Sequence, residues 1–279
     1  MTGRVQGMVA LVTGAARGQG RSHAVRLAQE GADIIAVDIA GQIATVPYPL
    51  ATPDDLAETA RQVEALDRRV VAAQADVRDW GGLKQAVDDG VAQLGQLDIV
   101  SANAGIFSHG TLEELTREAW NDMIAVNLTG VWHTLKATVP HIRAGGRGGS
   151  IILTSSTAGL RGMEHIGHYV AAKHGVVGIM RTAALELAPD NIRVNTVHPT
   201  SVNTDMVHNG ATYQLFAPEL PESERTRDVV AARFQAGNVL PVPWVESADI
   251  SNAVLWLASA ESRYVTGLEL KVDAGQLLR

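Results

Sequence analysis

Short apolar runs alternate with longer amphipathic stretches along this chain. Runs rich in Val, Ile and Leu predict seven buried strands, at residues 8–12, 33–37, 69–73, 97–101, 150–154, 192–197 and 268–272. Helical spacing of apolar residues predicts six helices between them, at residues 18–30, 53–66, 81–94, 117–142, 169–187 and 247–258. A repeating strand-helix order favours a parallel sheet covered on both faces. We therefore predict a single α/β domain over residues 1–279, with a Rossmann-like, doubly wound sheet.

Local signals indicate where two of these helices begin. Thr52 precedes Pro53, so its hydroxyl can cap a helix whose first position is proline, and Asp55 lies near the positive end of the helix dipole. Ser247 followed by Asp249 predicts a similar start for the last helix.

Two connections are longer than a doubly wound sheet needs. Residues 39–52 follow the second strand and carry a Pro-Tyr-Pro sequence. Residues 200–245 carry large apolar side chains among prolines and charges, which predicts a substrate lid with an apolar underside. The alternative for this second segment is a surface excursion that packs on its own side chains.

Composition excludes several classes of protein. The net charge of −7 comes without a basic stripe that could neutralise a phosphate backbone, so nucleic acid is not expected as a partner. The chain has no cysteine, which rules out disulfides and thiolate metal sites and fits a reducing compartment. No apolar run approaches the roughly 20 residues that span a bilayer, and no signal sequence is evident. We expect a cytoplasmic protein without a membrane role.

The first strand leads into a glycine-rich turn that opens a helix. Gly14, Gly18 and Gly20 allow the backbone to approach a pyrophosphate, which the N–H groups of the helix N-terminus can hold. Asp38 ends the second strand, where its carboxylate can accept hydrogen bonds from the adenosine ribose and repel a 2′-phosphate. This pattern favours NAD over NADP. Arg17 is the opposing signal, because a cation in the loop could reach a 2′-phosphate.

A second group of residues could move a proton. Ser156 follows the fifth strand, and Tyr169 and Lys173 lie four residues apart on the next helix, on one face. A nearby ammonium favours the phenolate, and lowering the tyrosine pKa from about 10 to about 7 needs roughly 4 kcal/mol. The phenolate could then take the hydroxyl proton of an alcohol while Ser156 holds the substrate oxygen.

Five features of the sequence together resemble the short-chain dehydrogenase/reductase family (SDR), over nearly the whole chain. They are residues 13–20, the Asn103-Ala104-Gly105 sequence, Asn127, Ser156 and the Tyr169-x-x-x-Lys173 pair. The resemblance implies an NAD-dependent alcohol dehydrogenase or ketoreductase with Asn127, Ser156, Tyr169 and Lys173 as catalytic residues. Asn127 would kink its helix and hold a water that relays protons from Lys173. The glycine loop and the resemblance together imply these cofactor contacts: Gly14, Arg17, Gly18, Gln19, Gly20, Asp38, Ile39, Asp76, Val77, Asn103, Ala104, Gly105, Tyr169, Lys173, Pro199, Thr200, Val202 and Thr204. Among them, Asp76 and Val77 would contact adenine, and Thr204 would bind the carboxamide.

One departure points to a branch of the family. Pro199 is followed by Thr200 where the family usually has glycine, and this feature, with the 39–52 insertion, is most similar to the carveol dehydrogenase branch of actinobacteria. That similarity implies a lipophilic, cyclic or terpenoid secondary alcohol or ketone as substrate, with mycofactocin as redox partner. It also implies that the insertion closes over the adenosine end of NAD and slows its exchange. Family members lead us to expect a homotetramer built on the helices at 117–142 and 169–187, and Trp120, Trp132 and Trp256 fit core or subunit contacts.

Other interpretations remain open at this point. The fold could serve a catalytically silent dinucleotide sensor, although a sensor has no need of a proton relay. An NADP-dependent carbonyl reductase is a second alternative, and a nucleotide-sugar epimerase or dehydratase would need a longer chain. Three histidines lie close in sequence, but no cysteine or suitable carboxylate completes a metal site, so none is predicted. His165 and His168 are expected to line the substrate mouth.

Overall fold

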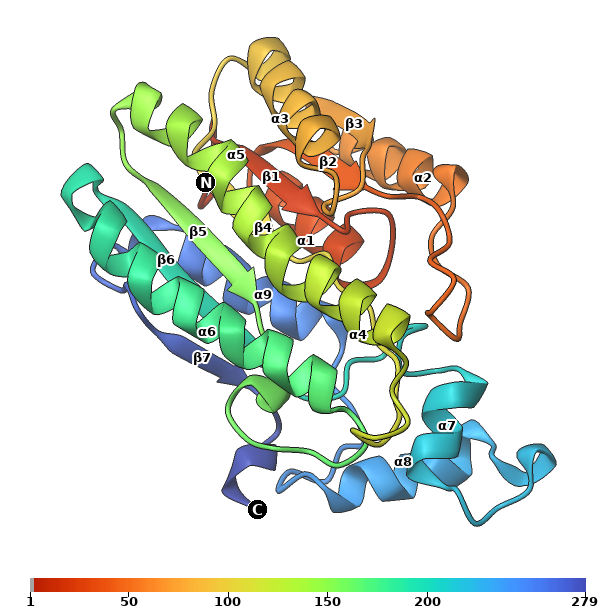
Figure 1. The fold of residues 1–279 in the computed structure, drawn as a ribbon. Helices are drawn as coiled ribbons and strands as arrows, with labels where there is room; N and C mark the ends of the chain where they lie inside the picture. The colour runs from red at the N-terminus through yellow and green to blue at the C-terminus, as the bar shows by residue number, and fades with distance from the viewer. Residues whose placement is uncertain (1–2) are drawn as a thin grey trace.

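In the computed structural model, which describes residues 3–279, the chain forms one seven-stranded sheet (Figure 1). Its order is β3-β2-β1-β4-β5-β6-β7, and every neighbouring pair is parallel. All seven predicted strands are confirmed, with ends displaced by at most two residues. The strands are β1 (Val9–Thr13), β2 (Asp33–Asp38), β3 (Val70–Gln74), β4 (Ile99–Ala102), β5 (Gly149–Thr154), β6 (Ile192–Pro199) and β7 (Glu269–Val272).

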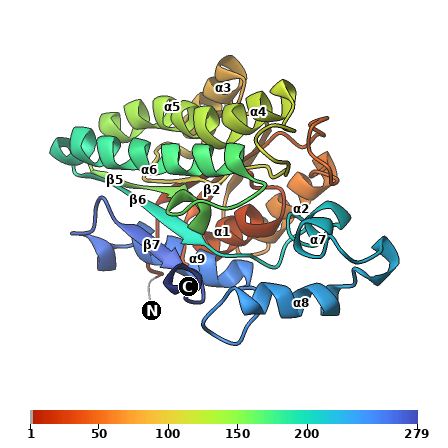
Figure 2. The same ribbon diagram turned by 60° about the horizontal axis from the view of Figure 1, so that its bottom comes forward.

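Helices cover both faces of the sheet, as Figure 2 shows from the side. Successive strand residues point to opposite faces, so Leu11 and Ile35 join one buried cluster while Ala10 and Ile34 join the other. The first cluster packs under α3 (Trp80–Leu94), α4 (Arg117–Ile124), α5 (Gly130–Gly145) and α6 (Gly167–Leu187), and the second under α1 (Gly18–Gln29), α2 (Pro53–Glu64) and α9 (Ser247–Ala258). Among the described residues, no helix combines the length and apolarity needed to cross a bilayer.

The helix expected over residues 117–142 is not continuous. It divides into α4 and α5 around a π-helical turn, Ala125–Thr129, and α5 continues through Pro140 to Gly145. Single π turns inside helices widen the backbone locally and are frequent at functional sites. The irregularity expected at Asn127 is therefore present.

The sequence pattern did not predict two helices in the 200–245 segment. They are α7 (Gly210–Phe216) and α8 (Arg227–Ala236), and the side chains of Asn209 and Thr226 cap them. Both caps were available in the sequence, because Asn and Thr are preferred at this position. The large apolar residues of this segment had indicated a lid without indicating its helices.

Both helix starts that the sequence indicated are present. Thr52 caps α2 and forms a reciprocal pair with Asp55, as expected. The last helix is capped by Glu246, whose backbone N–H donates to Asp249, and Ser247 is its first helical residue. The predicted start at Ser247 is therefore confirmed, and the capping residue is Glu246, one position before it.

The strand order places a crevice at one edge of the sheet. The chain runs outward from β1 to β3 and then crosses back to β4, which lies on the other side of β1. In such a sheet, ligands bind outside the carboxyl ends of the strands where the order reverses. The glycine turn after β1 and the segment after β4 both lie at this point. The insertion and α7 lie at the same side of the molecule (Figure 1).

Candidate active site

The glycine turn packs directly against the segment that follows β4. Gly14 has a φ of +66°, and a Cβ on it would come within 2.8 Å of the Ala104 Cα. A Cβ on Gly20 would lie 1.9 Å from the Gly14 carbonyl oxygen, so no other residue fits there. Asn103 donates from Nδ2 to the Thr13 carbonyl oxygen at 3.1 Å, which joins the two segments. The glycines are therefore required by close backbone packing as well as by an approaching ligand.

Most of the predicted cofactor contacts line one cleft at this turn. The residues of that cleft include Gly14, Arg17, Gly18, Gln19, Gly20, Asp38, Ile39, Asp76, Val77, Asn103, Ala104, Gly105 and Thr204. Tyr169, Lys173, Pro199, Thr200 and Val202 line an adjoining cavity, and Gln19, Asn103, Gly105 and Thr204 border both. Thr200 replaces the usual glycine without a left-handed backbone, and its N–H donates to the Val272 carbonyl oxygen at 3.3 Å.

Asp38 is tied to the backbone on both sides. One carboxylate oxygen accepts from the Ala16 N–H at 2.9 Å, and the other accepts from the Ala40 N–H at 2.8 Å. The carboxylate therefore braces the glycine turn and the turn after β2 while it faces the cleft. Each oxygen retains a second lone pair that a ribose hydroxyl can use.

Arg17 connects three segments around the mouth of the cleft. Its guanidinium donates to the Pro49 carbonyl oxygen at 2.5 Å and lies 3.0 Å from an Asp205 carboxylate oxygen. Pro49 belongs to the insertion and Asp205 to the segment after β6, so one side chain links both to the glycine turn. This cation is already paired, which weakens the case for a 2′-phosphate partner.

The 39–52 insertion reaches the reacting residues through Tyr48. The buried Tyr48 hydroxyl accepts a hydrogen bond from the Phe107 N–H at 3.1 Å, and burial raises the pKa of this phenol above its ordinary range. The Phe107 ring meets the Tyr169 ring edge-on, with centroids 5.3 Å apart. Sequence reasoning missed this contact, because nothing in the Pro-Tyr-Pro sequence indicates which distant backbone amide the phenol will meet.

Asp76 carries a structural pair in addition to lining the cleft. Arg78 holds its carboxylate at 2.7 Å and reaches Asp122 of α4 at 2.8 Å. Val77 packs so closely on α5 that a Cβ on Gly130 would lie 2.6 Å from it. These contacts fix the floor of the cleft on which the resemblance places adenine.

Tyr169 and Lys173 share one face of α6, as their spacing requires. The Lys173 ammonium is buried, donates to the Thr154 carbonyl oxygen at 2.8 Å and lies 5.5 Å from the centroid of the Tyr169 ring. Burial lowers the pKa of Lys173 to about 8. Burial also raises the pKa of Tyr169 to about 12, and a hydrogen bond with Ser156 opposes this rise.

The energy needed to ionise Tyr169 is therefore larger than the sequence suggested. Bringing a pKa of about 12 down to about 7 is a shift of five units, or roughly 7 kcal/mol, against the 4 kcal/mol expected for an ordinary phenol. The hydrogen bond with Ser156 is already included in the pKa of about 12. Lys173 is the group of this chain placed to lower it further, and a cationic ring beside the phenol would add to its effect.

Asn127 lies in the π turn with both ends of its amide bonded to one residue. Its Oδ1 accepts from the Ile106 N–H at 2.8 Å, and its Nδ2 donates to the Ile106 carbonyl oxygen at 2.9 Å. The position of a Cβ on Gly105 would be 3.4 Å from Asn127 Oδ1 and 3.7 Å from Lys173 Nζ. Glycine at 105 thus keeps open the space between the amide and the ammonium.

The adjoining cavity has a volume of about 420 Å³, within the range of small-molecule sites. Ser156, Tyr169 and Lys173 line one part of it, and the 200–245 segment supplies apolar side chains that include Met206, Val207, Leu215, Phe216 and Phe234. The same segment also packs on itself, since Ala217, Val230 and Phe234 form a small separate core. The segment therefore both borders the cavity and packs on its own side chains, and its role as a lid stays a prediction.

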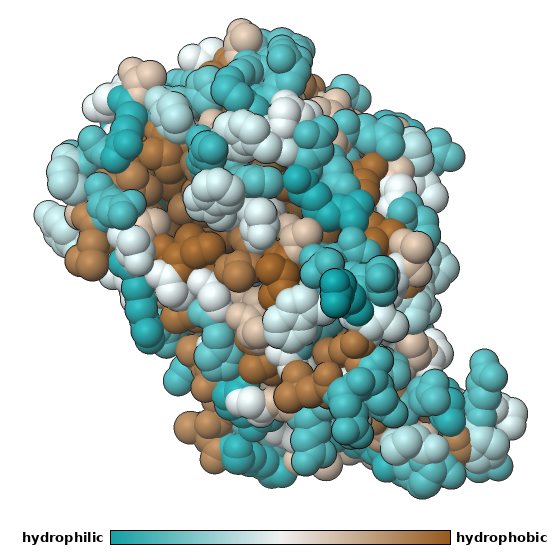
Figure 3. All heavy atoms as spheres, viewed as in Figure 1, coloured by the Kyte–Doolittle hydropathy of each residue, from teal (hydrophilic) through white to brown (hydrophobic). Residues whose placement is uncertain are grey.

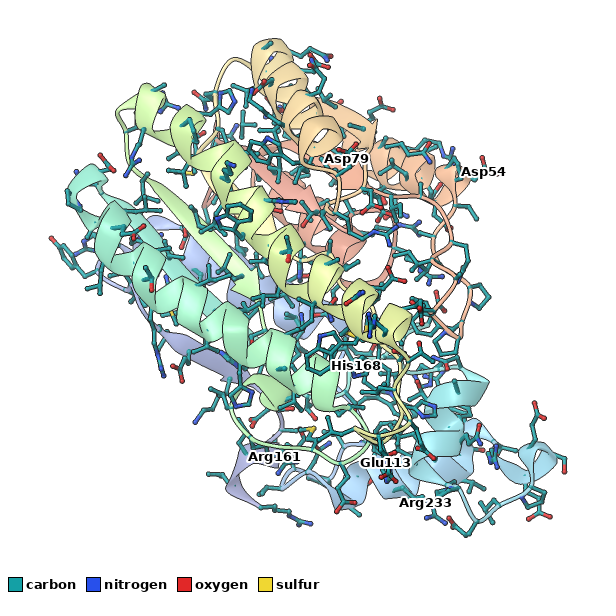
Figure 4. The ribbon with its side chains drawn as sticks, viewed as in Figure 1. Asp54, Asp79, Glu113, Arg161, His168 and Arg233 are labelled. Atoms are coloured by element: carbon teal, nitrogen blue, oxygen red, sulfur yellow. The ribbon has the colours of Figure 1, made fainter. Side chains whose placement is uncertain are left out.

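One of the two histidines expected at the substrate mouth is elsewhere. His165 lines the cavity, but His168 is fully buried at the start of α6 and shares a 2.9 Å hydrogen bond with the Ser108 hydroxyl (Figure 4). The helix begins two residues before the predicted start, which turns His168 inward. Within residues 3–279, no three His, Asp or Glu side chains cluster as a metal site would require.

The residues around the cleft fit a bound dinucleotide. Gln19 Oε1 is buried without a hydrogen-bond donor among the described residues, at a point that borders both the cleft and the cavity. An unsatisfied buried acceptor is costly, and the amide of a nicotinamide ring is the kind of donor that would relieve it. The glycine turn leaves the neighbouring helix N-terminus open to a pyrophosphate.

A parallel sheet of this order, with a glycine turn at its crossover and a Tyr-Lys pair beside it, defines a dinucleotide-dependent oxidoreductase. The chain belongs to the short-chain dehydrogenase family, whose pattern matches residues 8–214.

Proteins similar to this chain agree with that assignment. A putative short-chain type dehydrogenase/reductase of Mycolicibacterium smegmatis is 60% identical over all of both chains. The (-)-trans-carveol dehydrogenase of Rhodococcus erythropolis is 56% identical over 99% of each. The crystal structure of carveol dehydrogenase from Mycobacterium avium in complex with NAD is 60% identical, covers 100% of both chains and superposes with a TM-score of 0.98.

Proposed function

We propose that this protein is an NAD-dependent dehydrogenase of lipophilic, cyclic secondary alcohols of the carveol type. The observation that carries the proposal is the position of Tyr169, with Ser156 and Lys173, in a largely apolar cavity that opens onto the glycine cleft. The similar proteins named for carveol and for NAD support the substrate class and the cofactor. The pairing of Arg17 with Asp205 and Pro49 supports NAD over NADP.

In this proposal, Tyr169 is the proton acceptor. When bound, NAD supplies the hydride acceptor beside the cavity. The Ser156 hydroxyl orients the substrate oxygen, and the Tyr169 phenolate takes its proton. Lys173 stabilises the phenolate electrostatically, while Asn127 and Gly105 keep a path open through which the proton can leave. In the reverse direction, Tyr169 returns the proton to the nascent alkoxide.

Oxidation of (-)-trans-carveol by the purified protein tests the proposal, with the ketone product measured by gas chromatography. Turnover is expected with bound NAD and either an artificial electron acceptor or free NAD. A panel of cyclic and acyclic secondary alcohols provides the comparison. A protein that binds NAD and oxidises none of them would instead favour a dinucleotide sensor.

Replacing Lys173 by methionine is expected to move the pH profile of alcohol oxidation upward. The ammonium lies 5.5 Å from the Tyr169 ring centroid and favours the phenolate, so its removal is expected to raise the pKa of Tyr169. We expect the rising limb of kcat/KM against pH to shift by at least about one unit, which is 1.4 kcal/mol. Lys84→Met on the surface of α3 is the control, and an unshifted limb in Lys173→Met would contradict the role.

We further propose that the 39–52 insertion closes over the adenosine end of NAD and slows its exchange, and that mycofactocin accepts the electrons. Arg17 supports this by linking the insertion to Asp205 across the mouth of the cleft. Gln42 holds the insertion together, because its Nε2 donates to the carbonyl oxygens of Ile43, Val46 and Tyr48 and its Oε1 accepts from the Leu50 N–H. The cytoplasmic location expected from the sequence stays a prediction.

Replacing Gln42 by methionine is expected to speed release of NAD by about tenfold, since it removes several hydrogen bonds worth roughly 0.5–1.5 kcal/mol each from within the insertion. Gln42 does not line the cleft, so the chemical step should be unchanged. Dilution of the purified protein, followed by separation of free from bound NAD over time, gives the release rate. Gln85→Met on α3 is the matched control, and equal rates in all three proteins would count against the insertion as a cover.

The homotetramer expected from the family also stays a proposal, and an exposed apolar face supports it. Figure 3 shows apolar side chains gathered over α5 and α6. Trp120 is 40% exposed, Trp132 47% and Leu185 80%, so these residues are not core residues of a single chain. Sedimentation equilibrium should give the mass of four chains; the mass of one chain would refute the tetramer.

A further inference from the structure

We infer that the preferred substrate carries a second hydroxyl, remote from the one that is oxidised, and that the side-chain amide of Gln276 binds it. The inference rests on the proposed function, because it names the substrate class of the same cavity. It points to cyclic alcohols more oxygenated than a simple monoterpene alcohol.

Gln276 brings an unpaired amide to the substrate cavity. It lines the cavity but not the cofactor cleft, so a dinucleotide in the cleft does not account for it. Its Oε1 is buried and has no hydrogen-bond donor among the described residues, and Nε2 donates to none of them. A hydroxyl can donate to the amide oxygen and accept from the amide nitrogen, so it satisfies the group in either orientation of the amide.

The backbone around Gln276 is fixed in several ways. The Asp273 carboxylate accepts from the Gly275 N–H and the Leu277 N–H, both at 3.0 Å. Gly275 has a φ of +78°, and a Cβ on it would lie 2.8 Å from the Val239 Cβ. Arg161 donates to the Gln276 carbonyl oxygen at 3.2 Å; Figure 4 labels Arg161 beside this final segment. The backbone that carries the amide is therefore fixed before substrate arrives.

The surroundings make this amide selective. A Cβ on Gly237 would lie 3.8 Å from Gln276 Nε2, so the glycine leaves the space beside the amide open. The neighbouring Phe234 side chain is apolar and offers the amide no partner. A substrate with a methyl group at this point would leave the buried Oε1 unpaired, whereas a hydroxyl of similar size would donate to it. Sites built to bind a hydroxyl discriminate strongly against analogues that lack it.

The test compares a cyclohexanol that carries a second hydroxyl across the ring with its isostere that carries a methyl group there. Wild-type protein is expected to favour the diol by about tenfold or more, both in kcat/KM and in binding to the NAD-loaded protein measured by ligand-observed NMR. Gln276→Met should bring both ratios close to one. Gln235→Met, on an exposed position of α8, should leave them unchanged.

The two readouts separate this inference from the proposed function. If neither compound is oxidised while the diol still binds more tightly, the proposed function fails and the role of Gln276 stands. If the wild-type protein binds the methyl compound equally well or better, the inference is refuted, whether or not Gln276→Met folds. An unchanged preference in a folded Gln276→Met protein would also refute it.

Discussion

Tyr169→Phe protein is expected to oxidise alcohols about 10²–10⁴-fold more slowly than wild type while it retains NAD. The phenol oxygen is the group placed to take the substrate proton, and its loss leaves Ser156 without a base beside it. The ring itself keeps its edge contact with Phe107, so the fold should be unaffected. Single-turnover formation of bound NADH measures the chemical step, and the nicotinamide content of the purified protein measures cofactor binding.

Tyr264→Phe serves as the control, because Tyr264 is 89% exposed and lies outside the cavity. A Tyr169→Phe protein that turns over at the wild-type rate would remove the proposed mechanism. A protein that loses NAD together with activity would instead assign the phenol mainly to cofactor binding.

Asp38→Asn is expected to lower the preference for NAD over NADP by on the order of 10- to 100-fold. The carboxylate repels a 2′-phosphate by like charge, and asparagine removes that charge at nearly constant shape. The amide can accept from the Ala16 N–H or the Ala40 N–H but not from both, so the glycine turn is also weakened, by about 1–3 kcal/mol.

The ratio of the two dissociation constants separates these effects. A loosened turn weakens the binding of NAD and of NADP alike, whereas loss of the repulsion strengthens the binding of NADP alone. Dissociation constants measured by calorimetry on protein stripped of cofactor give the ratio, with Asp54→Asn on the exposed start of α2 as control. If the ratio of the NAD and NADP dissociation constants stays constant while both affinities fall, Asp38 stabilises the turn and does not select the cofactor.

The fold could be predicted because its signals are local and repeated. Buried parallel strands need continuous runs of Val, Ile and Leu, and the covering helices need apolar residues every three or four positions, so each element is visible within about ten residues. The division of the helix at Asn127 is not visible in this way. It depends on an amide that pairs with Ile106, 21 positions earlier in the chain.

The candidate site was predictable where two reacting groups share one element or one turn. Tyr169 and Lys173 are four residues apart on a helix, and the glycines follow one strand. Other residues of the site act through partners in distant segments. Tyr48 contacts Phe107, and Arg17 contacts Pro49 and Asp205. Gln276 reaches the site as part of the cavity wall. No spacing rule connects such residues.

The sequence by itself determined the doubly wound sheet, the glycine turn with Asp38, and the pairing of phenol and ammonium, because each follows from backbone periodicity. Only the tertiary structure decided that Arg17 is paired, that His168 faces inward and that an unpaired amide borders the substrate cavity. It also decided that burial raises the pKa of Tyr169 to about 12. Burial and long-range hydrogen bonding depend on which distant segments pack together, and that information is not contained in any local pattern.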